Sequence, residues 1–587
     1  MVLFNLCTIS IINSARYEFI MKAIGIALDL GTSGFRGQAI DLSVKGEPRI
    51  ISTAVSSRHP LPGANVIDHL HYAIEVGLDQ AHDVIIRAVN KIIDHLRIDR
   101  TKIVRIAVCG NPIQLSLFQE IEIRDLAYAG QRKLQALGVV PPKRDAQIVS
   151  LTEIRGLCGP PEAQVIIPPA VRHEIGADAL AMMIQTGMLE KDDIAICTDY
   201  GTNAEMALIY QGTVYTGSTA AGPALEGQHI EHGLLALPGA ITNVNLVTGA
   251  MAHPPGGPTG SRPNNSGRYL ETFILDQDMI SRPGAVVDPV DGEILDTGQL
   301  AAVGITGTGV VALLAEGMRA ALIKIPKIQT PDNAIHLQDG IRFTEKDLLE
   351  AGKAIGSVRA GHITLCQAAG ISLDQVETAY MSGASGTYVD ALKAQAIGMV
   401  PANLKRIYQV GNTSLAMARE LVADENRLWE MKQVADQLRQ HHCMFAASKT
   451  FQNIFILELS YWTEGMPMSM YQKYLKRYNI PPIPERPLTT PEVIKTVKRD
   501  IPEFGNLGLQ IVTDIGEIKH IVFQGCLGDA ACIWECPENA LTLQEQDGEF
   551  RISIDLARCN GVACRRCERA CKEKVFDLIA LLTSDTD

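Results

Sequence analysis

The sequence predicts an α/β protein with a duplicated nucleotide-binding core and a small cysteine-rich α+β module at its C-terminal end. Three observations predict this architecture. Strand-like apolar runs alternate with helical stretches from residue 21 to about residue 460. Two similar hairpin patterns stand about 170 residues apart within that region. Seven of the thirteen cysteines fall between Cys526 and Cys571.

Length and composition are typical of a globular protein of several domains. The 587 residues are 46% hydrophobic and 20% charged, enough to bury sizeable cores. The formal charge of −13 is spread along the chain, and the basic clusters are short, so neither nucleic acid nor a membrane is expected as a partner. The first apolar stretch, MVLFNLCTISII, is too short to span a bilayer and has no charged segment before it. We therefore expect a cytoplasmic protein.

Changes in composition divide the chain into five consecutive segments. A Pro-rich, mixed stretch at 463–498 is typical of a linker. Residues before Met21 precede the first strand-like run and are expected to be a disordered extension or an unused upstream start. The expected segments are the extension at 1–20, the first part of the core at 21–190, its second part at 191–462, a linker at 463–505 and the cysteine-rich module at 506–587.

The first candidate for nucleotide binding is ALDLGTSGFRGQAIDL (27–42), which reads as two apolar strands joined by a tight turn. Asp29 ends the first strand, where a carboxylate can hold Mg²⁺ or its waters. A turn of small residues lets backbone N–H groups approach phosphate oxygens. The turn residues are Gly31, Thr32, Ser33 and Gly34. Taken alone, the pattern is equally typical of an ordinary β-hairpin.

The pattern recurs in AICTDYGTNAEMALIY (195–210), with Asp199 at the corresponding place. The turn residues that would contact phosphate there are Gly201, Thr202 and Asn203. A third segment, ETAYMSGASGTYVDALKAQ (377–395), has a small-residue turn between a strand and a helix, which suits an adenosine or phosphate contact but also an ordinary βα turn. That turn consists of Gly383, Ala384, Ser385 and Gly386. No Walker sequence GxxxxGK[ST] occurs.

In this order, the three motifs resemble the phosphate and adenosine motifs of the actin, Hsp70 and acetate kinase superfamily. The resemblance implies a duplicated ATPase core that binds ATP and Mg²⁺, with Asp29 and Asp199 holding the metal and its waters. It leaves open whether the chain is a kinase or an ATP-driven conformational switch. Arg36 and Glu205 are either catalytic or merely paired surface charges.

Two cysteine runs dominate the C-terminal module. CNGVACRRCERAC (559–571) spaces its cysteines by four, two and three residues, close to the bacterial ferredoxin pattern C-x₂-C-x₂-C-x₃-C. CLGDAACIWECP (526–537) keeps that pattern with Asp529 at the second ligand position. A zinc site would need self-contained sets of four ligands, and a disulfide scaffold is atypical of a cytosolic ATP-binding protein.

The ferredoxin resemblance implies two [4Fe–4S] clusters with crossed ligation. The ligands of the first would be Cys526, Asp529, Cys532 and Cys571. The ligands of the second would be Cys559, Cys564, Cys567 and Cys536. Because a carboxylate is a harder and more labile iron ligand than a thiolate, the first cluster is expected to convert to a [3Fe–4S] form on mild oxidation.

A nucleotide-driven core joined to an electron carrier suits a reaction that drives an electron uphill. A gap of a few hundred millivolts corresponds to about 5–10 kcal/mol, which differential nucleotide binding can supply. Together with the first hairpin and the cysteine runs, four further strings resemble the reductive activases of methylamine methyltransferase corrinoid proteins from methanogens. These strings are HPLPGANVIDHL (59–70), AVCGNPIQLSLF (107–118), EIRDLAYAG (122–130) and GPALEG (222–227).

That resemblance implies an ATP-dependent iron–sulfur oxidoreductase that reduces an inactive Co(II) corrinoid to Co(I) for methanogenesis from methylamines. Its partners would be the corrinoid proteins of mono-, di- or trimethylamine systems and a low-potential electron donor. Two alternatives stay open. An activator of a 2-hydroxyacyl-CoA dehydratase would likewise combine ATP with an iron–sulfur cluster, but such activators are shorter chains that lack a ferredoxin tail. A small-molecule kinase of the superfamily would leave the clusters without a purpose.

Overall fold

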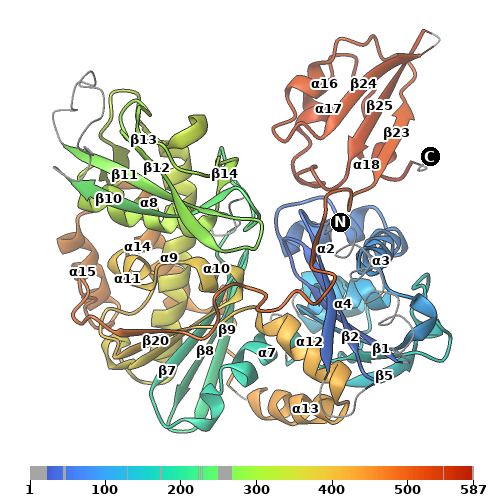
Figure 1. The fold of residues 1–587 in the computed structure, drawn as a ribbon, viewed down its shortest axis with the longest axis horizontal. Coiled ribbons are helices and arrows are strands. Elements are labelled where there is room, and N and C mark those ends of the chain that lie inside the picture. Colours follow the sequence, from blue (N-terminus) through green and yellow to red (C-terminus); the bar gives the residue numbers. More distant parts are fainter. Residues whose placement is uncertain are drawn as a thin grey trace, which may run out of the picture. The chain divides into compact units, whose positions relative to one another are not determined.

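The computed structural model describes residues 23–584 apart from 44–47, 129, 172–174, 223, 225–226, 228, 249–266, 440 and 547. The expected extension at 1–20 lies outside the described residues. The chain forms two compact units (Figure 1). Unit 1 comprises residues 1–178, 414–435 and 503–587, and unit 2 comprises residues 179–413 and 436–502.

Unit 1 is built on a seven-stranded sheet in the order β22-β3-β2-β1-β4-β6-β5. β1 is antiparallel to β2 and parallel to β4, and β2 is antiparallel to β3. Every side chain of β1 is buried, as expected of a central strand covered on both faces. The strands are β1 (Ile24–Leu30), β2 (Phe35–Asp41), β3 (Arg49–Ser56), β4 (Ile103–Gly110), β5 (Gln147–Ser150), β6 (Gln164–Ile167) and β22 (Leu509–Val512).

The helices of unit 1 have recognisable start signals. The side chain of Asn65 accepts hydrogen bonds from the first backbone N–H groups of α2. Asn111 does the same for α4, which has Pro112 in its first turn. α3 packs on β2 and β3 through an apolar face. The helices are α2 (Val66–Glu75), α3 (Leu78–His95), α4 (Pro112–Gln119), α5 (Arg124–Ala127), α6 (Gln131–Ala136) and, for the most part, α12 (Thr413–Ala423) and α13 (Asn426–Leu438).

Unit 2 is built on a six-stranded sheet in the order β21-β20-β19-β7-β8-β9 and a five-stranded sheet in the order β13-β12-β11-β10-β14. The first sheet contains β7 (Ala195–Tyr200), β8 (Asn203–Tyr210), β9 (Thr213–Ala220), β19 (Thr378–Ser382), β20 (Arg406–Gln409) and β21 (Glu492–Lys495). The second contains β10 (Ala240–Thr248), β11 (Arg268–Leu275), β12 (Ser281–Val287), β13 (Ile294–Asp296) and β14 (Gly304–Ile305).

The helices of unit 2 enclose its large apolar core, in which α9 packs along α14 and against β8 and β9. They are α8 (Gly307–Arg319), α9 (Glu345–Ala368), α10 (Gly383–Tyr388), α11 (Ala391–Ala396), α14 (Lys449–Glu464), α15 (Met468–Arg477) and, for the most part, α7 (Ala177–Gln185). Two short strand pairs complete the unit: β15 (Ile323–Lys324) with β16 (Lys327–Ile328), and β17 (Ala334–His336) with β18 (Arg342–Thr344).

The two large sheets repeat one strand pattern. In unit 1 an antiparallel meander, β1-β2-β3, is continued from β1 by the parallel strands β4 and β6. In unit 2 the meander β7-β8-β9 is continued from β7 by the parallel strands β19 and β20. Each meander begins with one of the two hairpins singled out in the sequence. The strand pattern is therefore duplicated together with the hairpins.

The cysteine module (residues 513–587) contains one three-stranded antiparallel sheet, in the order β23-β25-β24, with short helices beside it (Figure 1). Its elements are β23 (Ile518–Val522), β24 (Leu541–Gln546), β25 (Glu549–Asp555), α16 (Ala531–Trp534), α17 (Arg566–Ala570) and α18 (Leu578–Leu582). Residues 509–512, expected within this module, instead form β22 at the edge of the large sheet of unit 1.

The expected linker at 463–505 contains regular structure, which corrects the sequence interpretation. α15 and β21 lie within it, and β21 adds a parallel strand to β20. The prolines flank these elements rather than interrupt them: Pro467 is the N-cap of α15 and Pro491 precedes β21. Among the described residues, no helix is both long enough and apolar enough to cross a membrane.

Candidate nucleotide site and cysteine groups

The first hairpin places Asp29 at the end of β1 with its side chain nearly buried. Asp29 pairs across the strands with Arg36, and the Arg36 Nη1 atom lies 3.2 Å from Asp29 Oδ2. In the turn, Thr32 Oγ1 accepts a hydrogen bond of 3.1 Å from Asn111 Nδ2. The carboxylate of this hairpin is therefore held by a cation on the neighbouring strand.

The second hairpin has a carboxylate where the first has an arginine. Asp199 pairs across β7 and β8 with Glu205, which is 7% exposed and accepts a hydrogen bond of 3.3 Å from Ser218 Oγ. Two adjacent carboxylates are the ligands that a divalent cation such as Mg²⁺ prefers. Of the two hairpins, the second therefore has the stronger chemistry for a metal ion.

The Gly-rich turn after β19 lies directly beside Asp199. Ser382 pairs with Asp199 in parallel register, and Gly383 follows it with φ +80°. A Cβ atom at Gly383 would stand 2.3 Å from Asp199 Oδ1, so the close approach requires glycine. The structure thus brings together two of the three predicted nucleotide motifs within unit 2.

The remaining predicted residues occupy the turns as expected, with differing exposure. Ser33 and Thr202 are buried, and the Thr202 carbonyl accepts a hydrogen bond from Gly222 N. Gly34 and Gly386 are buried as well, whereas the other turn residues keep part of their surface accessible. These are Gly31, Thr32, Gly201, Asn203, Ala384 and Ser385. Their roles in nucleotide binding stay predictions.

Asn111 is a residue of this site that the sequence interpretation missed. It follows β4, as Gly383 follows β19, and so holds the same place in the duplicated pattern. The signal was present as Asn-Pro after an apolar strand, which marks a helix start but not a contact to a turn about 80 residues away in the sequence.

The seven clustered cysteines form two groups in space. Burial raises the pKa of Cys532 to about 11, and the thiols of Cys526 and Cys571 add to this shift. Burial likewise raises the pKa of Cys559 to about 12, with contributions from Cys567, Cys536 and Cys564. Groups that influence each other's charge in this way lie close together, so each run contributes one cysteine to the other run's group.

The second group surrounds a single pocket. All four of its cysteines line this pocket, together with apolar residues such as Leu541 and Ile554. The backbone N–H of Ala540 also approaches Cys536 Sγ at 3.3 Å. A pocket lined by four cysteines and by apolar side chains fits a [4Fe–4S] cluster, whose assembly would replace the thiol protons with iron.

Asp529 occupies the place in the first group that Cys564 holds in the second. Each is followed by one residue in the left-handed region, Ala530 at φ 58° and Arg565 at φ 45°, directly before a short helix. The second residue of that helix is a buried cysteine in both cases. The predicted ligand position is thus retained in the backbone, with a carboxylate in it.

The carboxylate of Asp529 already has partners. Its Oδ1 accepts from Ala531 N at 3.1 Å, and Lys572 Nζ lies 3.2 Å from its Oδ2, although outside ideal hydrogen-bond geometry. The hydrogen bond from Ala531 and the ammonium of Lys572 hold the pKa of Asp529 below its usual value. Iron ligation by Asp529 stays a prediction. Among the described residues, no group of three or more Asp, Glu, His or Cys side chains is arranged to hold a single metal ion. This does not bear on the predicted clusters, because each thiolate ligand of a [4Fe–4S] cluster binds a different iron atom.

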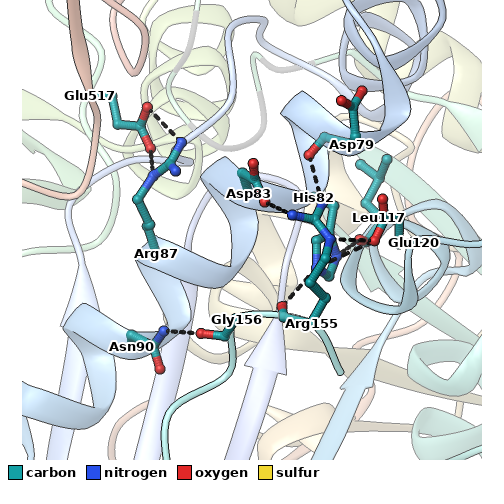
Figure 2. Close-up of polar contacts among 10 residues, drawn as sticks. All are labelled: Asp79, His82, Asp83, Arg87, Asn90, Leu117, Glu120, Arg155, Gly156 and Glu517. Carbon is teal, nitrogen blue, oxygen red and sulfur yellow. Dashed lines mark hydrogen bonds and ion pairs between the residues drawn. The ribbon is translucent and has the colours of Figure 1, made fainter. Parts of the chain in front are cut away.

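The cysteine module is attached to α2 and α3 of unit 1. Arg87 of α3 makes a bidentate ion pair with Glu517, with Nη2 3.0 Å from Oε2 (Figure 2). Arg565 Nη2 lies 2.9 Å from Glu75 Oε2 at the end of α2. The Gly63 N–H donates to the Cys559 carbonyl over 2.8 Å. Residues of the second cysteine group therefore contact α2 and the segment before it, within the same unit as the first hairpin.

The duplicated strand pattern with its paired hairpins defines an ASKHA-type nucleotide-binding fold. The family described as "C-terminal domain of RACo the ASKHA domain" matches residues 193–472, and "RACo middle region" matches residues 24–191. A solved structure, "Reductive activator for corrinoid,iron-sulfur protein", has a TM-score of 0.59 at 24% identity, over 75% of this chain and 66% of that one. These matches confirm the predicted α/β core. The ferredoxin-like nature of the cysteine module stays a prediction.

Two curated relatives are similar to this chain, and the first of them shows its family. The "[Co(II) methylated amine-specific corrinoid protein] reductase" of Methanosarcina barkeri is 47% identical over 92% of this chain and 95% of that protein. The "Corrinoid activation enzyme RamQ" of Eubacterium limosum is 26% identical over 64% of this chain and 60% of that protein. The chain belongs to the family of reductive activases of methylated-amine corrinoid proteins, as its sequence motifs predicted.

Proposed function

We propose that this protein is an ATP-dependent reductive activase that returns the inactive Co(II) corrinoid of methylamine methyltransferase corrinoid proteins to Co(I). The observation that carries the proposal is the similarity to the Methanosarcina barkeri reductase along nearly the whole of both chains. The duplicated hairpins and the two cysteine groups would supply the nucleotide site and the electron carrier that such a reaction needs.

The nucleotide component rests on the hairpin residues. Asp199 and Glu205 would hold Mg²⁺ and its waters, and the turn at Gly383 would lie against the nucleotide. Asp29, neutralised by Arg36, would orient water or phosphate rather than hold the metal. In the cysteine module, bound clusters would supply one-electron transfer at low potential. The chain's own contribution there is a set of thiols held close together in two partly apolar sites.

Anaerobic absorption spectroscopy tests this proposal. A Co(II) corrinoid protein of a mono-, di- or trimethylamine system is mixed with the purified chain, a low-potential reductant and MgATP. We expect the Co(I) band to appear only when the chain and ATP are both present. Asp199→Ala should abolish the ATP-dependent reduction and keep the iron–sulfur absorption, because Asp199 lies in unit 2 and the cysteines lie in unit 1.

Two results would contradict the proposal. Phosphoryl transfer to an added sugar or acid, with no corrinoid reduction, would indicate a kinase. Equal loss of bound iron in the Asp199→Ala variant would show that the hairpin and the cysteine groups are not separate components.

A further inference from the structure

One segment of unit 1 touches both the first hairpin and the second cysteine group. This connecting segment, residues 57–65, joins β3 to α2. Directly before the segment, at the end of β3, Ser56 Oγ accepts a hydrogen bond of 2.7 Å from the hairpin residue Phe35 N and donates one of 2.8 Å to Arg58 O. The His59 ring packs edge-on against Phe35, with 5.1 Å between the ring centroids.

The other end of the connecting segment meets the cysteine module at a pair of glycines. Gly63, which donates to the Cys559 carbonyl, has φ +119°, and a Cβ atom there would stand 2.2 Å from the Asp68 Cβ. A Cβ atom at Gly561 would lie 3.4 Å from the Gly63 Cα. This contact between the two backbones is therefore close and depends on a conformation that favours glycine.

A buried polar network lies between the two ends. His59 and His69 are buried and stacked, with ring centroids 3.8 Å apart. The Gln114 amide bridges them: its Oε1 accepts from His59 Nε2 at 3.1 Å, and its Nε2 donates to His69 Nδ1 at 2.8 Å. Burial lowers the pKa of His59 to about 4 and holds the pKa of His69 well below its usual value. Both rings are therefore neutral near pH 7.

The same network reaches the hairpin turn through α4. Asn111, the N-cap of α4, accepts from Gln114 N at 3.0 Å and donates to Thr32 Oγ1. On the other side, His69 Nε2 has no hydrogen-bond partner among the described residues, although the backbone of Gly63 is close enough to influence the pKa of His69. Gln114 thus stands between Thr32 in the turn and Gly63 at the Cys559 peptide.

We propose that Gln114 is a positioning residue that, with the His59–His69 pair, transmits the state of the first hairpin to the Cys559 peptide. The proposal rests on the function proposed above, in which the hairpin binds nucleotide and Cys559 holds a cluster. Buried networks in packed cores switch between discrete arrangements rather than deform continuously. Hydrogen bonding around the ligands of a cluster tunes its potential. Nucleotide bound at the turn would therefore shift the potential of the cluster in the second cysteine group.

The test is a redox titration followed by electron paramagnetic resonance, with and without a non-hydrolysable ATP analogue. We expect the analogue to shift the midpoint potential of one cluster in the wild-type protein. Gln114→Met, which keeps the volume but removes both hydrogen bonds, should lose most of that shift. Its iron content and its affinity for the analogue should stay within about twofold of the wild-type values.

Gln119→Met is the matched control, because it makes the same substitution on the same helix. Gln119 hydrogen-bonds to Leu115 O and to Gln147, neither of which is part of the hairpin or the cysteine module. The control variant should keep the wild-type shift. A full shift in Gln114→Met would overturn the inference. The inference would also be overturned if the wild-type protein binds the analogue and reduces the corrinoid but shows no shift of the midpoint potential. That result would leave the proposed function intact. Failure of the wild-type protein to bind the analogue would overturn both.

A second measurement needs no variant. Amide hydrogen exchange of the cluster-loaded wild-type protein is compared with and without the analogue. Peptides covering 57–65 and 559–564 should both change in protection, whereas a peptide covering 156–163 should not. Unchanged protection in both of the first two peptides would contradict the inference even if Gln114→Met fails to fold.

Discussion

At the scale of single residues, Asp529 shows how one substitution in a repeated motif changes the expected chemistry. The backbone at Ala530 and the buried Cys532 reproduce the geometry around Cys564, so the fold retains the predicted ligand position. Oxygen is a harder ligand than sulfur, and iron held by it is lost more readily on oxidation. The first cysteine group should therefore hold the more labile of the two clusters.

We predict that mild oxidation produces a three-iron electron paramagnetic resonance signal from the cluster of the first group. Asp529→Cys should suppress that signal, because a fourth thiolate then retains the iron. Lys572→Gln is the control: it removes the cation 3.2 Å from Asp529 and leaves the ligand set unchanged, so the signal should persist. An Asp529→Cys protein with the wild-type signal would show that Asp529 is not a ligand.

At the scale of elements, the packing of α9 on α14 depends on small residues and one buried ion pair. Gly352 lies against Trp462 and Gly356 against Glu458, which lets the helices approach closely. Arg359 Nε donates to Glu458 Oε1 at 2.7 Å and Nη2 donates to Oε2 at 2.6 Å. Burial by itself would lower the pKa of Arg359, but the carboxylate of Glu458 more than offsets this, and the pKa is raised.

Glu458→Gln should lower the free energy of unfolding of unit 2 by about 3–5 kcal/mol, because it leaves a buried guanidinium without its counter-charge. Urea unfolding can be followed by tryptophan fluorescence, since Trp462 is buried in this unit while Trp429 and Trp534 are exposed. Lys353→Ala, which removes an exposed ion pair with Glu350 on the same α9, should cost roughly 0.5 kcal/mol or less. Equal effects of the two variants would contradict the role given to the buried pair.

At the scale of the whole molecule, the sequence predicted what is encoded locally. Each hairpin is a continuous strand–turn–strand, and each cysteine run has a fixed spacing, so both were recognisable without a structure. The parallel pairing of residues 509–512 with β3 could not be predicted from the sequence, because it joins residues more than 400 positions apart. The same holds for Asn111 and Gln114, whose partners lie in other segments and leave no periodic signal.

The place of β22 leads to a prediction about truncated chains. β22 pairs with the edge of β3, where Leu507 N donates to Ile51 O, Thr53 N to Gly508 O and Ser57 N to Val512 O. A chain ending at Gly505 would lose these bonds, each worth roughly 0.5–1.5 kcal/mol, and would expose a strand edge that favours aggregation. A chain ending at Thr513 would keep β22 and lose only the cysteine module.

We therefore expect the chain ending at Thr513 to bind and hydrolyse ATP without reducing the corrinoid, and the chain ending at Gly505 to unfold at a temperature several degrees lower and to aggregate. Differential scanning calorimetry measures the unfolding temperatures of the two chains, and light scattering measures their aggregation. An ATPase assay and the Co(I) absorption band measure their activities. Equal thermal stability would show that β22 contributes little to the sheet. Corrinoid reduction by the chain ending at Thr513, with the same reductant, would show that electrons reach the cobalt without the cysteine groups, and the two-component reaction proposed here would be wrong.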